Sequence, residues 1–391
     1  MNIQAAVIFG GRSVEHEVSV ITGMQVLAAL DRAKYDPIPL YIAKDGVLYS
    51  GEEFGRIETY RDLPKALDPS RAVTLSREGG KAVLRPVARR LFGPDKPVTI
   101  DVAIPAVHGT FAEDGSLQGL LELLNIPYCG CDVLSSAICM DKPSAKALLR
   151  GAGLPVLPDV LLERTAYHED PEGAINTLEA ALPYPLIVKP ANLGSSVGIG
   201  KARDRASLRN ALDLAFSFAN RVLAEPAVEP LREINAAVLG DANHGIDPRA
   251  SVCEEPVGQD EVLSYADKYQ SGSHKGMSGA RRVIPAELSP EMTSRLQGLA
   301  ADAFRALGCA GVVRVDFLLD GGETPYINEL NTLPGSMAFY LWEKTGLPFA
   351  KLLDELVSLA FARHRGRAAL TFTQNTNLLA TAHFGKGKAG S

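Results

Sequence analysis

Two short polar segments in the last third of the chain bring together residue types that bind magnesium and phosphate. Arg314-Val-Asp316 is followed, after a glycine turn, by Glu329-Leu-Asn331, which predicts two neighbouring strands. Side chains alternate across a strand, so Arg314 and Asp316 project from one face. Asp316, Glu329 and Asn331 offer the oxygen ligands that Mg²⁺ takes when nucleotide phosphates complete its shell. The hairpin indicates a phosphoryl or acyl-phosphate site; the alternative is a surface hairpin with scattered charges.

Length and composition describe an ordinary globular chain. Its 391 residues are enough for two or three domains, and 46% of them are hydrophobic. The formal net charge is −6 and the isoelectric point about 5.7, so no broad basic field is available for nucleic acid or a membrane surface. No apolar run has the roughly 18 residues of a membrane helix, and the first residues lack the charged segment of a signal peptide. We therefore expect a cytoplasmic protein.

The five cysteines form no familiar metal or redox pattern. Cys129-Gly-Cys131 is spaced too closely for the usual zinc or thioredoxin-like pairs. An odd number of cysteines in a cytoplasmic chain predicts free thiols.

The first part of the chain alternates strand-like and helix-like runs. In chain order we expect a strand, a helix, a hairpin, a strand and a helix, over residues 4–9, 17–30, 38–49, 102–107 and 117–124. This alternation over 1–135 predicts a parallel sheet with helices on both faces. Ligands of such sheets lie beyond the carboxyl ends of the strands, where Glu15 and His108 follow. Residues 51–97 show weak periodicity and receive no assignment.

The rest of the chain mixes helices and strands as an α+β arrangement does. The expected elements are a helix over 132–150, strands over 186–189 and 197–199, a helix over 206–218, a strand over 222–225, a long loop over 259–281 and a helix over 290–307. From 364 onward apolar periodicity is lost, so we expect a partly disordered tail.

A glycine-rich turn lies between the strands predicted over 186–189 and 197–199. Residues 194–200 lack the Gly-Lys-Ser/Thr ending of a P-loop, and no helix follows as in a dinucleotide fold. What remains is a turn whose backbone N–H groups could close over phosphates, or an ordinary hairpin. Lys189 ends the preceding strand and Lys142 begins a helix, so both are candidate phosphate ligands, or else solvated surface charges. Glu225 and Glu233 flank an apolar link that could hold adenine and ribose.

Taken in order, these segments resemble the D-alanine–D-alanine ligase family. The matching motifs cover about residues 3–363 and are GGRSVEHEVS at 10–19, His108-Gly109, EDGSLQG at 113–119, Met140-Asp141-Lys142, Val188-Lys189-Pro190, GSSVG at 194–198, Lys268-Tyr269, Arg314-Val-Asp316 and ELNTLPG at 329–335. The resemblance implies an ATP-grasp fold, α/β and α+β in class. It has an N-terminal α/β domain at 1–135 and two α+β domains, 136–230 and 231–363, that enclose ATP, followed by the tail at 364–391.

The resemblance implies a two-step ligation. ATP phosphorylates the carboxylate of one D-alanine, and the amine of a second attacks the acyl phosphate for peptidoglycan precursor synthesis. Glu15 would hold the first ammonium, and His108 would lie near the first carboxylate. Arg314 and the backbone N–H of Gly335 would stabilise the tetrahedral oxyanion. The implied partners are small molecules, with no nucleic acid or membrane, and the enzyme would be a homodimer.

The same resemblance assigns the nucleotide, metal and lid residues. Two Mg²⁺ ions, which Mn²⁺ could replace, would bind Asp316, Glu329 and Asn331. The ATP contacts would come from Lys142, Lys189, Lys268, Ser195 and Ser196 at the phosphates, Glu225 and Val228 at adenine, and Glu233 at ribose. Ser195 and Tyr269, with Glu15, would form the hydrogen-bonded link that shuts the loop 259–281 over the site.

The chain departs from the family pattern beside the second substrate. Where the family has a Ser-Leu pair gripping the second carboxylate, this chain has Tyr340 and Leu341, and Ser336 is the nearest hydroxyl that could compensate. Pro226 stands where a lysine is common, and 44–97 is longer than the family minimum. Three alternatives therefore stay open: a ligase with D-Ser or another amine as nucleophile, a nucleotide-binding regulator without turnover, and a small-molecule kinase.

Overall fold

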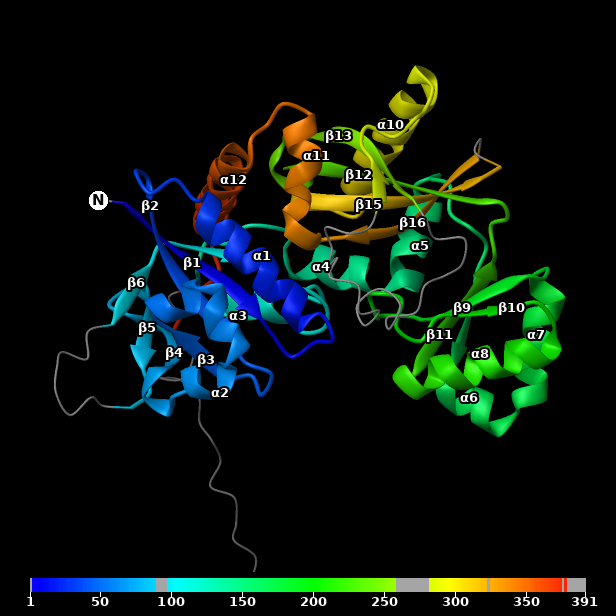
Figure 1. Cartoon of the computed structure of the whole chain (residues 1–391), viewed down its shortest axis with the longest axis horizontal. Coiled ribbons are helices and arrows are strands. Elements are labelled where there is room, and N and C mark those ends of the chain that lie inside the picture. Colours follow the sequence, from blue (N-terminus) through cyan, green and yellow to red (C-terminus); the bar gives the residue numbers. More distant parts are fainter. Residues whose placement is uncertain (1, 89–96, 258–280, 322–323, 375, 378–391) are drawn as a thin grey trace, which may run out of the picture.

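The computed structural model describes residues 2–88, 97–257, 281–321, 324–374 and 376–377, and it contains three sheets. In Figure 1 the N-terminal sheet lies at the left and the four-stranded sheet at the lower right. The five-stranded sheet lies between and above them. The predicted domain limits at 135, 230 and 363 stay predictions, although the strands of the three sheets fall within 3–105, 160–226 and 231–331.

The N-terminal sheet has the strand order β6-β5-β4-β3-β2-β1-β7. Its strands are β1 (Ile3–Gly10), β2 (Tyr35–Ile42), β3 (Leu48–Ser50), β4 (Ala72–Glu78), β5 (Lys81–Pro86), β6 (Val98–Ile100) and β7 (Val102–Pro105). β1 pairs in parallel with β2 and β7, which confirms the parallel prediction for these three strands. From β2 to β6 the pairing is antiparallel, so the sheet is mixed.

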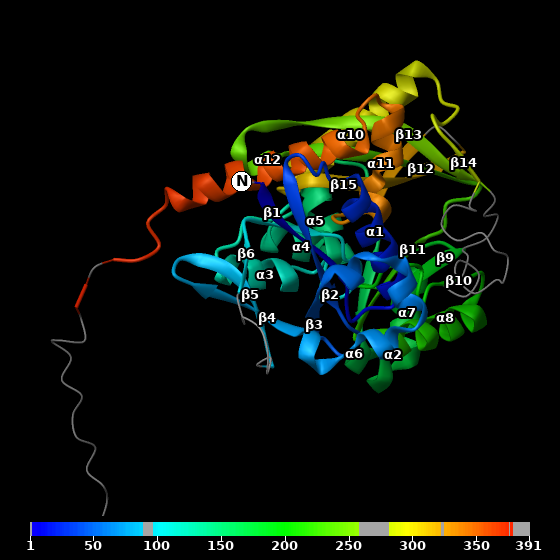
Figure 2. The same cartoon turned by 60° about the vertical axis from the view of Figure 1, so that its left-hand side comes forward.

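Both faces of β1 are covered, as predicted. Val7 and Phe9 pack with side chains of α1 (His16–Ala29) and of the C-terminal α12 (Phe349–Ala368). Ile8 faces the other way, in the cluster with α3 (Ser116–Leu123). Full burial of side chains of this size contributes roughly 1.5–3 kcal/mol each. Figure 2 shows α12 alongside β1, so the end of the chain helps to close the N-terminal core.

The unassigned region 51–97 forms part of this sheet. After three 3₁₀ turns, η1 (Glu52–Gly55), η2 (Ile57–Arg61) and η3 (Pro69–Arg71), and the short α2 (Leu63–Ala66), β4 and β5 form a hairpin. Gly79 and Gly80 connect them with φ of 55° and 82°, the backbone that a two-residue hairpin turn of this type requires.

The helix predicted over 132–150 is two helices. α4 (Val133–Met140) and α5 (Lys142–Gly151) are separated at Asp141, whose backbone is extended (φ −89°, ψ 95°). The Asp141 side chain accepts a hydrogen bond from the Ser144 N–H and so caps α5. This break turns Lys142 into the first residue of a helix.

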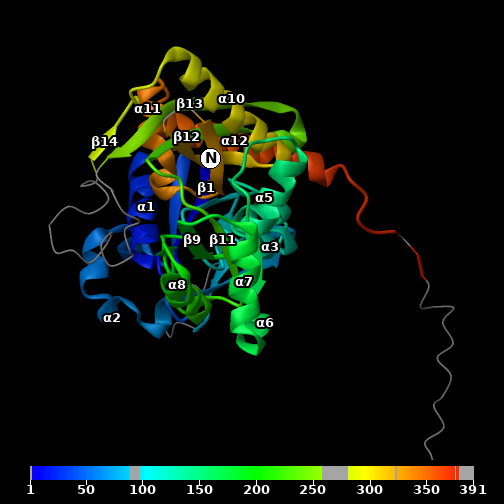
Figure 3. The ribbon, with the colours of Figure 1, turned by 90° about the vertical axis from the view of Figure 1, so that its right-hand side faces the viewer.

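The four-stranded sheet has the order β10-β9-β11-β8. Its elements are β8 (Val160–Glu163), α6 (Arg164–Glu169), α7 (Pro171–Ala181), β9 (Leu186–Pro190), β10 (Gly200–Ala202), α8 (Arg205–Phe218) and β11 (Arg221–Pro226). Figure 3 shows α6, α7 and α8 gathered beside β9 and β11. β9 and β10 are antiparallel, as the glycine turn predicted. The second strand, however, begins at Gly200 rather than at 197.

The five-stranded sheet has the order β14-β13-β12-β15-β16. Its elements are β12 (Leu231–Asp241), η4 (Ala242–His244), β13 (Ile246–Val257), β14 (Arg281–Val283), α10 (Pro290–Ala306), β15 (Ala310–Asp320) and β16 (Thr324–Asn331). The β15–β16 pair is the predicted antiparallel hairpin. A 3₁₀ turn, η5 (Gly335–Ala338), then leads into α11 (Phe339–Lys344).

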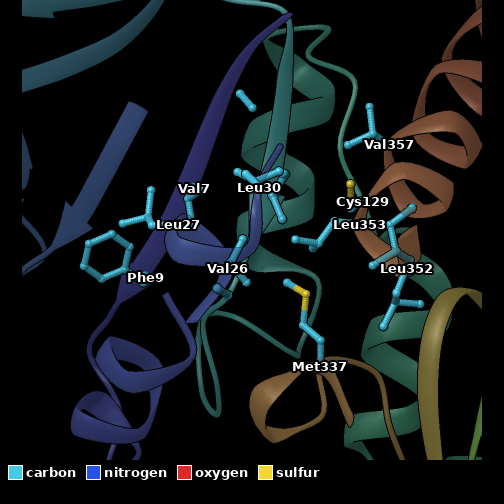
Figure 4. Close-up of a cluster of buried hydrophobic side chains, with 14 of the residues drawn as sticks. Val7, Phe9, Val26, Leu27, Leu30, Cys129, Met337, Leu352, Leu353 and Val357 are labelled. Atoms are coloured by element: carbon cyan, nitrogen blue, oxygen red, sulfur yellow. The ribbon is translucent and has the colours of Figure 1, made fainter. Parts of the chain in front are cut away.

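The segment after β16 is anchored in the N-terminal core. Met337 belongs to the cluster that contains Val26 of α1 and Leu352 and Leu353 of α12 (Figure 4). Ser336, Met337 and Ala338 all have left-handed backbone, with φ of 54°, 52° and 50°. Residues other than glycine adopt this conformation only when the surrounding packing imposes it. The turn after Gly335 is therefore fixed by contacts with the N-terminal region.

Some predictions fall outside the described residues. Lys268, Tyr269 and most of the loop 259–281 lie there, as does 378–391 of the tail. Within the described part, α12 continues to Ala368, past the predicted start of the tail at 364. All five cysteines are buried and unbridged. No helix in the described ranges is long and apolar enough to cross a membrane.

Candidate active site

The carboxyl ends of β1 and β7, the loop after β9 and the end of β16 meet at one cavity. It has about 410 Å³ of free space, part of it open to solvent. Its lining residues are Glu15, Glu113, Cys139, Met140, Lys142, Leu193, Gly194, Ser195, Glu329, Leu330, Asn331 and Thr332. Residues from five separate motifs, 10–19, 113–119, 140–142, 194–198 and 329–335, therefore converge on one place.

Glu15 and Ser195 close one side of this cavity. Glu15 directly precedes α1, and its carboxylate accepts a short hydrogen bond from the Ser195 hydroxyl. Ser195 and Ser196 have left-handed backbone, with φ of 53° and 58°, so the loop after β9 turns sharply toward Glu15. Burial raises the pKa of Glu15, and this outweighs the lowering effect of the Ser195 hydrogen bond. The predicted contact between Glu15 and Ser195 is present.

Lys142 also lines the cavity. Its ammonium donates a 2.8 Å hydrogen bond to the Leu193 carbonyl and lies 3.4 Å from a carboxylate oxygen of Glu329. Its side chain is buried. The Lys142 backbone N–H donates to the Ala191 carbonyl, which holds the N-terminus of α5 against the segment after β9. A buried ammonium that faces a loop and a carboxylate can contact an anionic ligand entering between them.

Glu225 forms a buried charge cluster behind the cavity. Lys189 and Lys146 each donate a hydrogen bond of 2.5 Å to it, one to each carboxylate oxygen. Burial acts to raise the pKa of Glu225, but the two lysines outweigh it and lower the pKa. Lys189 also donates to the Asn328 side chain at 3.1 Å. Sequence reasoning missed Lys146; its spacing of one helical turn from Lys142 on α5 was the available signal.

The predicted metal residues lie side by side across β15 and β16. Asp316 is directly opposite Glu329, and Arg314 is opposite Asn331. The Arg314 guanidinium donates two hydrogen bonds of 2.7 Å to Asp316, and the Asn331 amide donates a third at 3.0 Å. The prediction that Arg314 and Asp316 share one strand face is therefore confirmed.

The charge balance of the cavity suits a cation bound with an anionic ligand. Burial raises the pKa of Asp316 despite Arg314, and burial together with Glu15 raises that of Glu113 to about 8. Burial acts against ionisation of Glu329 as well, but Lys142 and Lys189 lower its pKa. A divalent ion would relieve this crowding of carboxylates. The oxygen donors fit Mg²⁺, although no group of three His, Cys, Asp or Glu in the described ranges surrounds one metal position.

His108 joins the N-terminal sheet to the loop after β16. Its Nδ1 lies 2.8 Å from the Leu333 carbonyl, which can only accept, so Nδ1 carries the proton. Nε2 then accepts from the Thr22 hydroxyl at 2.8 Å, and Thr22 accepts the Ser336 N–H at 3.1 Å. Burial lowers the pKa of His108 to about 4, so the ring is neutral near pH 7. Both ring nitrogens are engaged by the protein.

Glu113 and Thr22 are further residues to which the sequence reasoning gave no role. Glu113 accepts the backbone N–H groups of Gly109 at 2.8 Å and of Leu333 at 3.2 Å. Leu333 is thus held through both its N–H and its carbonyl, by Glu113 and by His108. The signal for Glu113 was its place in the EDGSLQG motif.

The remaining predicted residues in the described ranges lie outside the cavity lining, as do Lys189, Glu225, Arg314 and Asp316. Glu233 stands on β12 opposite Leu318, and Val228 is half-buried in the link after β11. Tyr340 is half-buried on α11, whereas the Leu341 side chain is fully buried in the core. In the described part of the chain, the cavity lining includes none of these four residues, nor Gly335 or Ser336.

Comparison with known proteins identifies the family of this chain. The family description "D-ala D-ala ligase N-terminus" matches residues 4–131, and "D-ala D-ala ligase C-terminus" matches residues 148–358. The chain belongs to the D-alanine–D-alanine ligase family. D-alanine–D-alanine ligase A of Salmonella typhimurium is 40% identical over 376 residues, covering 95% of this chain and 99% of that protein. The predicted family, and with it an ATP-dependent ligase, is confirmed.

Solved structures agree with this assignment. The D-alanine-D-alanine ligase from Coxiella burnetii superposes with a TM-score of 0.78 at 32% identity, covering 94% of this chain and 96% of its own. The VanG D-Ala:D-Ser ligase from Enterococcus faecalis also gives 0.78 at 32% identity, covering 92% of this chain and 100% of its own. The predicted mixed α/β and α+β fold is that of D-alanine–D-alanine ligases.

Proposed function

We propose that this enzyme joins two D-alanine molecules at the expense of ATP, through a D-alanyl phosphate, for peptidoglycan precursor synthesis. The observation that carries the proposal is the convergence of Glu15, Ser195, Lys142 and Asn331 around one cavity, where the Asn331 amide is hydrogen-bonded to the Arg314–Asp316 pair. A carboxylate that could hold an ammonium and a lysine that could contact phosphates thus line one cavity, and a guanidinium is linked to its wall. The enzyme would act as a cytoplasmic homodimer.

In the first step the carboxylate of one D-alanine attacks the γ-phosphorus of ATP, and ADP leaves. Glu15 offers the negative charge that the first ammonium needs, and its hydrogen bond to Ser195 fixes the orientation of the carboxylate. Lys142 and Lys189 would contact the phosphates, with Lys268 as a third contact and the loop of Ser195 and Ser196 above. Positioning and charge stabilisation supply most of the rate in such a transfer.

Asp316, Glu329 and Asn331 would hold two Mg²⁺ ions, with Mn²⁺ as a substitute. When bound, the ions neutralise charge on the transferring phosphoryl group. Binding ATP and metal would also change the pairing seen here, because Arg314 and the Asn331 amide both donate to Asp316. Adenine would lie against Glu225 and Val228, and ribose against Glu233.

In the second step the amine of the second D-alanine attacks the acyl carbon. A C–N bond forms and the amine loses a proton. The C–O bond between the acyl carbon and the phosphate breaks, and phosphate leaves. Arg314 and the backbone N–H of Gly335 would stabilise the negative charge on the tetrahedral oxygen. The network of His108, Thr22 and Glu113 holds Leu333 and Ser336, so it fixes the segment that carries Gly335.

His108 was predicted to lie near the first carboxylate. With Nδ1 and Nε2 both bonded within the protein, we propose that it acts by holding this segment in place. Ser336 would add its hydroxyl beside the second substrate, and Leu341 its backbone N–H. Tyr269 would complete the link with Glu15 and Ser195 when the 259–281 loop closes.

A second candidate function keeps the first step but uses D-Ser or another amine in the second. Tyr340 in place of the family serine and the structural likeness to a D-Ala:D-Ser ligase favour keeping it. The two are separated by incubating enzyme, ATP, Mg²⁺ and D-Ala with or without equimolar D-Ser, and weighing the products by mass spectrometry.

We expect ADP, phosphate and D-Ala–D-Ala in equal amounts. A mixed dipeptide in large excess would favour the alternative, and a stable phosphorylated product would indicate a kinase. ATP binding without D-Ala-dependent ADP release would indicate a regulatory protein. The three catalytic outcomes differ in product mass. The regulatory outcome gives no product and is recognised by measuring ATP binding alongside.

A further inference from the structure

An arginine at the start of β11 lies outside the cavity but is bonded to the segment that carries Lys142. The Arg221 guanidinium donates to both carboxylate oxygens of Asp141, at 2.8 Å and 3.4 Å. Asp141 directly precedes Lys142, which begins α5 and lines the cavity. The proposed reaction gives Arg221 no part, and none of the matching motifs includes it.

Backbone hydrogen bonds close a ring around this ion pair. The Lys142 N–H donates to the Ala191 carbonyl at 2.9 Å, and the Ala191 N–H donates to the Arg221 carbonyl at 3.0 Å. With the bond from Arg221 to Asp141, these contacts join the starts of α5 and β11 to the end of β9. Lys189 stands two positions before Ala191. The ring therefore connects the backbone of Lys142 to the strand end that carries Lys189, the other lysine proposed to contact phosphates.

The ring joins elements of two separate hydrophobic cores. Ala145 and Leu149 of α5 pack in the core of the five-stranded sheet, with side chains of β15 and α10. Val188 of β9 and Val222 of β11 pack in the core of the four-stranded sheet, with side chains of α7 and α8. Because the two cores are separate, the spacing between α5 and these strands depends on the polar contacts that cross between them.

Two charge pairs cross this boundary with reversed polarity. Arg221 and Glu225 are four positions apart on β11, so they project from one face of the strand. Arg221 binds Asp141 at the N-cap of α5, and Glu225 binds Lys146 in the next turn of the helix. A helix docked in another register would bring like charges together. The two pairs therefore specify one position of α5 against β11.

Asp141 can transmit the position of Arg221 to the helix because its two oxygens have different partners. Oδ1 accepts the Ser144 N–H at 3.1 Å and the Ser144 hydroxyl at 2.6 Å, which caps α5. Oδ2 takes the shorter bond from Arg221. The Arg221 side chain also lies 3.6 Å from Glu163, its neighbour across β8, and remains 38% exposed, whereas Asp141 is 20% exposed. The pair is thus partly shielded from water.

The position of the first turn of α5 decides where the Lys142 ammonium lies. This ammonium donates to the Leu193 carbonyl at 2.8 Å and lies 3.4 Å from Glu329. Leu193 lines the cavity beside Gly194 and Ser195. A shift of α5 away from β11 would move the ammonium away from this loop, above the proposed phosphate positions. Small errors in the placement of a charged group are enough to weaken its contact with a ligand.

We propose that Arg221 is a positioning residue of the phosphate site, which acts through Asp141 to hold the first turn of α5 and keep the Lys142 ammonium on the phosphates of ATP. This inference rests on the proposed ligation and adds a residue to its nucleotide site. The ring contacts Lys142 and the strand of Lys189 rather than Glu15, so the defect on losing Arg221 falls on ATP and not on D-alanine.

The test measures the KM for ATP and the KM for D-Ala by steady-state ADP release. Arg221→Met keeps most of the length of the side chain but removes its charge. We expect the KM for ATP to rise about three- to fivefold, as for the loss of a partly exposed ion pair, and the KM for D-Ala to stay unchanged. Arg221→Lys keeps the charge without the planar fork, so it should recover part of the lost affinity.

Arg85→Met is the matched control. Arg85 also donates to both oxygens of one carboxylate, that of Glu78, at 2.7 Å and 2.5 Å. This pair has side chains 45% and 36% exposed and lies in the β4–β5 hairpin of the N-terminal sheet. Its loss should leave both KM values unchanged.

A double-mutant cycle tests the route through Asp141. Asp141→Asn keeps an oxygen that can cap α5 but loses the charge that attracts Arg221. If Arg221 acts through Asp141, Arg221→Met should have no further effect on the KM for ATP in the Asp141→Asn background. Two effects that multiply would overturn this route.

The other outcomes are equally distinct. If Arg221→Met is folded by circular dichroism and has the wild-type KM for ATP, the proposal is overturned. Equal rises in the KM for ATP and the KM for D-Ala would indicate a general structural role and overturn it as well. A wild-type enzyme that releases no ADP with D-Ala overturns the proposed ligation itself. Calorimetric ATP binding by the same variants then still decides whether Arg221 supports the phosphate site.

Discussion

Strand register in the five-stranded sheet places Glu254, Asn235, Asp316 and Glu329 opposite one another in that order, and the two ends of this polar row differ in what balances their carboxylates. At one end Glu329 lines an open cavity and faces Lys142, and Asp316 beside it is bound by Arg314. At the other end Glu254 is enclosed by Tyr340, Asn235 and Arg282. The same strand register thus presents carboxylates along one face, and their partners decide whether a carboxylate can receive a cation or instead fixes a neighbouring side chain.

The cluster behind the open end gives the largest expected effect. Lys146→Met removes one of the two lysines bound to the buried Glu225, so we expect a loss of about 3–5 kcal/mol in the free energy of unfolding, measured with urea. Lys44→Met is the matched control. Lys44 lies 2.6 Å from Glu17, but their side chains are 63% and 68% exposed, so the loss should stay below about 1 kcal/mol. Equal losses would contradict the role given to burial.

Arg314 stands between the two ends, and its loss should reduce the rate of ligation. Arg314→Ala removes a donor to the tetrahedral oxygen, so kcat should fall about 10²–10³-fold, or about 2.7–4 kcal/mol. Arg314→Lys keeps the charge without the planar fork and should recover only part of the rate. The measurement is steady-state ADP release, with melting temperature as the fold control. A fall of less than tenfold for Arg314→Ala would show that Arg314 does not stabilise the tetrahedral oxygen.

The two ends also differ in how far the sequence could predict them. The β15–β16 hairpin and its polar residues are close in the chain and alternate with apolar ones, so local pattern was enough. Glu254 and Tyr340 are 86 positions apart, and Lys146 and Glu225 are 79 apart. Such pairs arise from tertiary packing, which periodicity does not encode. The family motifs gave Glu15 and Ser195 with their contact, and also Lys142, but not the Leu193 and Ala191 carbonyls that hold Lys142.

Local misreadings have equally specific causes. The prediction of one helix over 132–150 ignores the break at Asp141, although Pro143, the second residue of α5, marks a new start. The β4–β5 hairpin was missed because charged residues on its exposed face obscure the alternation, while Gly79-Gly80 gave a turn signal. The left-handed turn after Gly335 has no sequence signal, since packing of Met337 imposes it.

The link between the N-terminal sheet and this turn should make stability depend on pH. Burial lowers the pKa of His108 from 6.5 to about 4, so between these values the unfolded chain binds a proton that the folded chain does not. Stability therefore falls as the pH drops from about 6.5 to 4, by roughly 3 kcal/mol from this group. His108→Gln can keep both hydrogen bonds without titrating. Urea unfolding at pH 7 and pH 4.5 should show a smaller loss for the variant; equal losses would mean that His108 titrates normally.

The smallest expected effect compares one amide at each end. Asn235 donates to Glu254 at 3.3 Å in a buried setting, and Asn328 accepts from Lys189 at 3.1 Å where it is half-buried. Hydrogen bonds to charged groups contribute about 1.5–3 kcal/mol. Water can replace the lost bond at the half-buried Asn328 but not at the buried Asn235. Asn235→Ala should therefore cost about 2 kcal/mol in urea unfolding, and Asn328→Ala less. Because Asn328 contacts a lysine proposed to bind ATP, Asn328→Ala should raise the KM for ATP, whereas Asn235→Ala should leave it unchanged. The reverse pattern of KM values would show that the enclosed end, rather than the open one, faces the nucleotide.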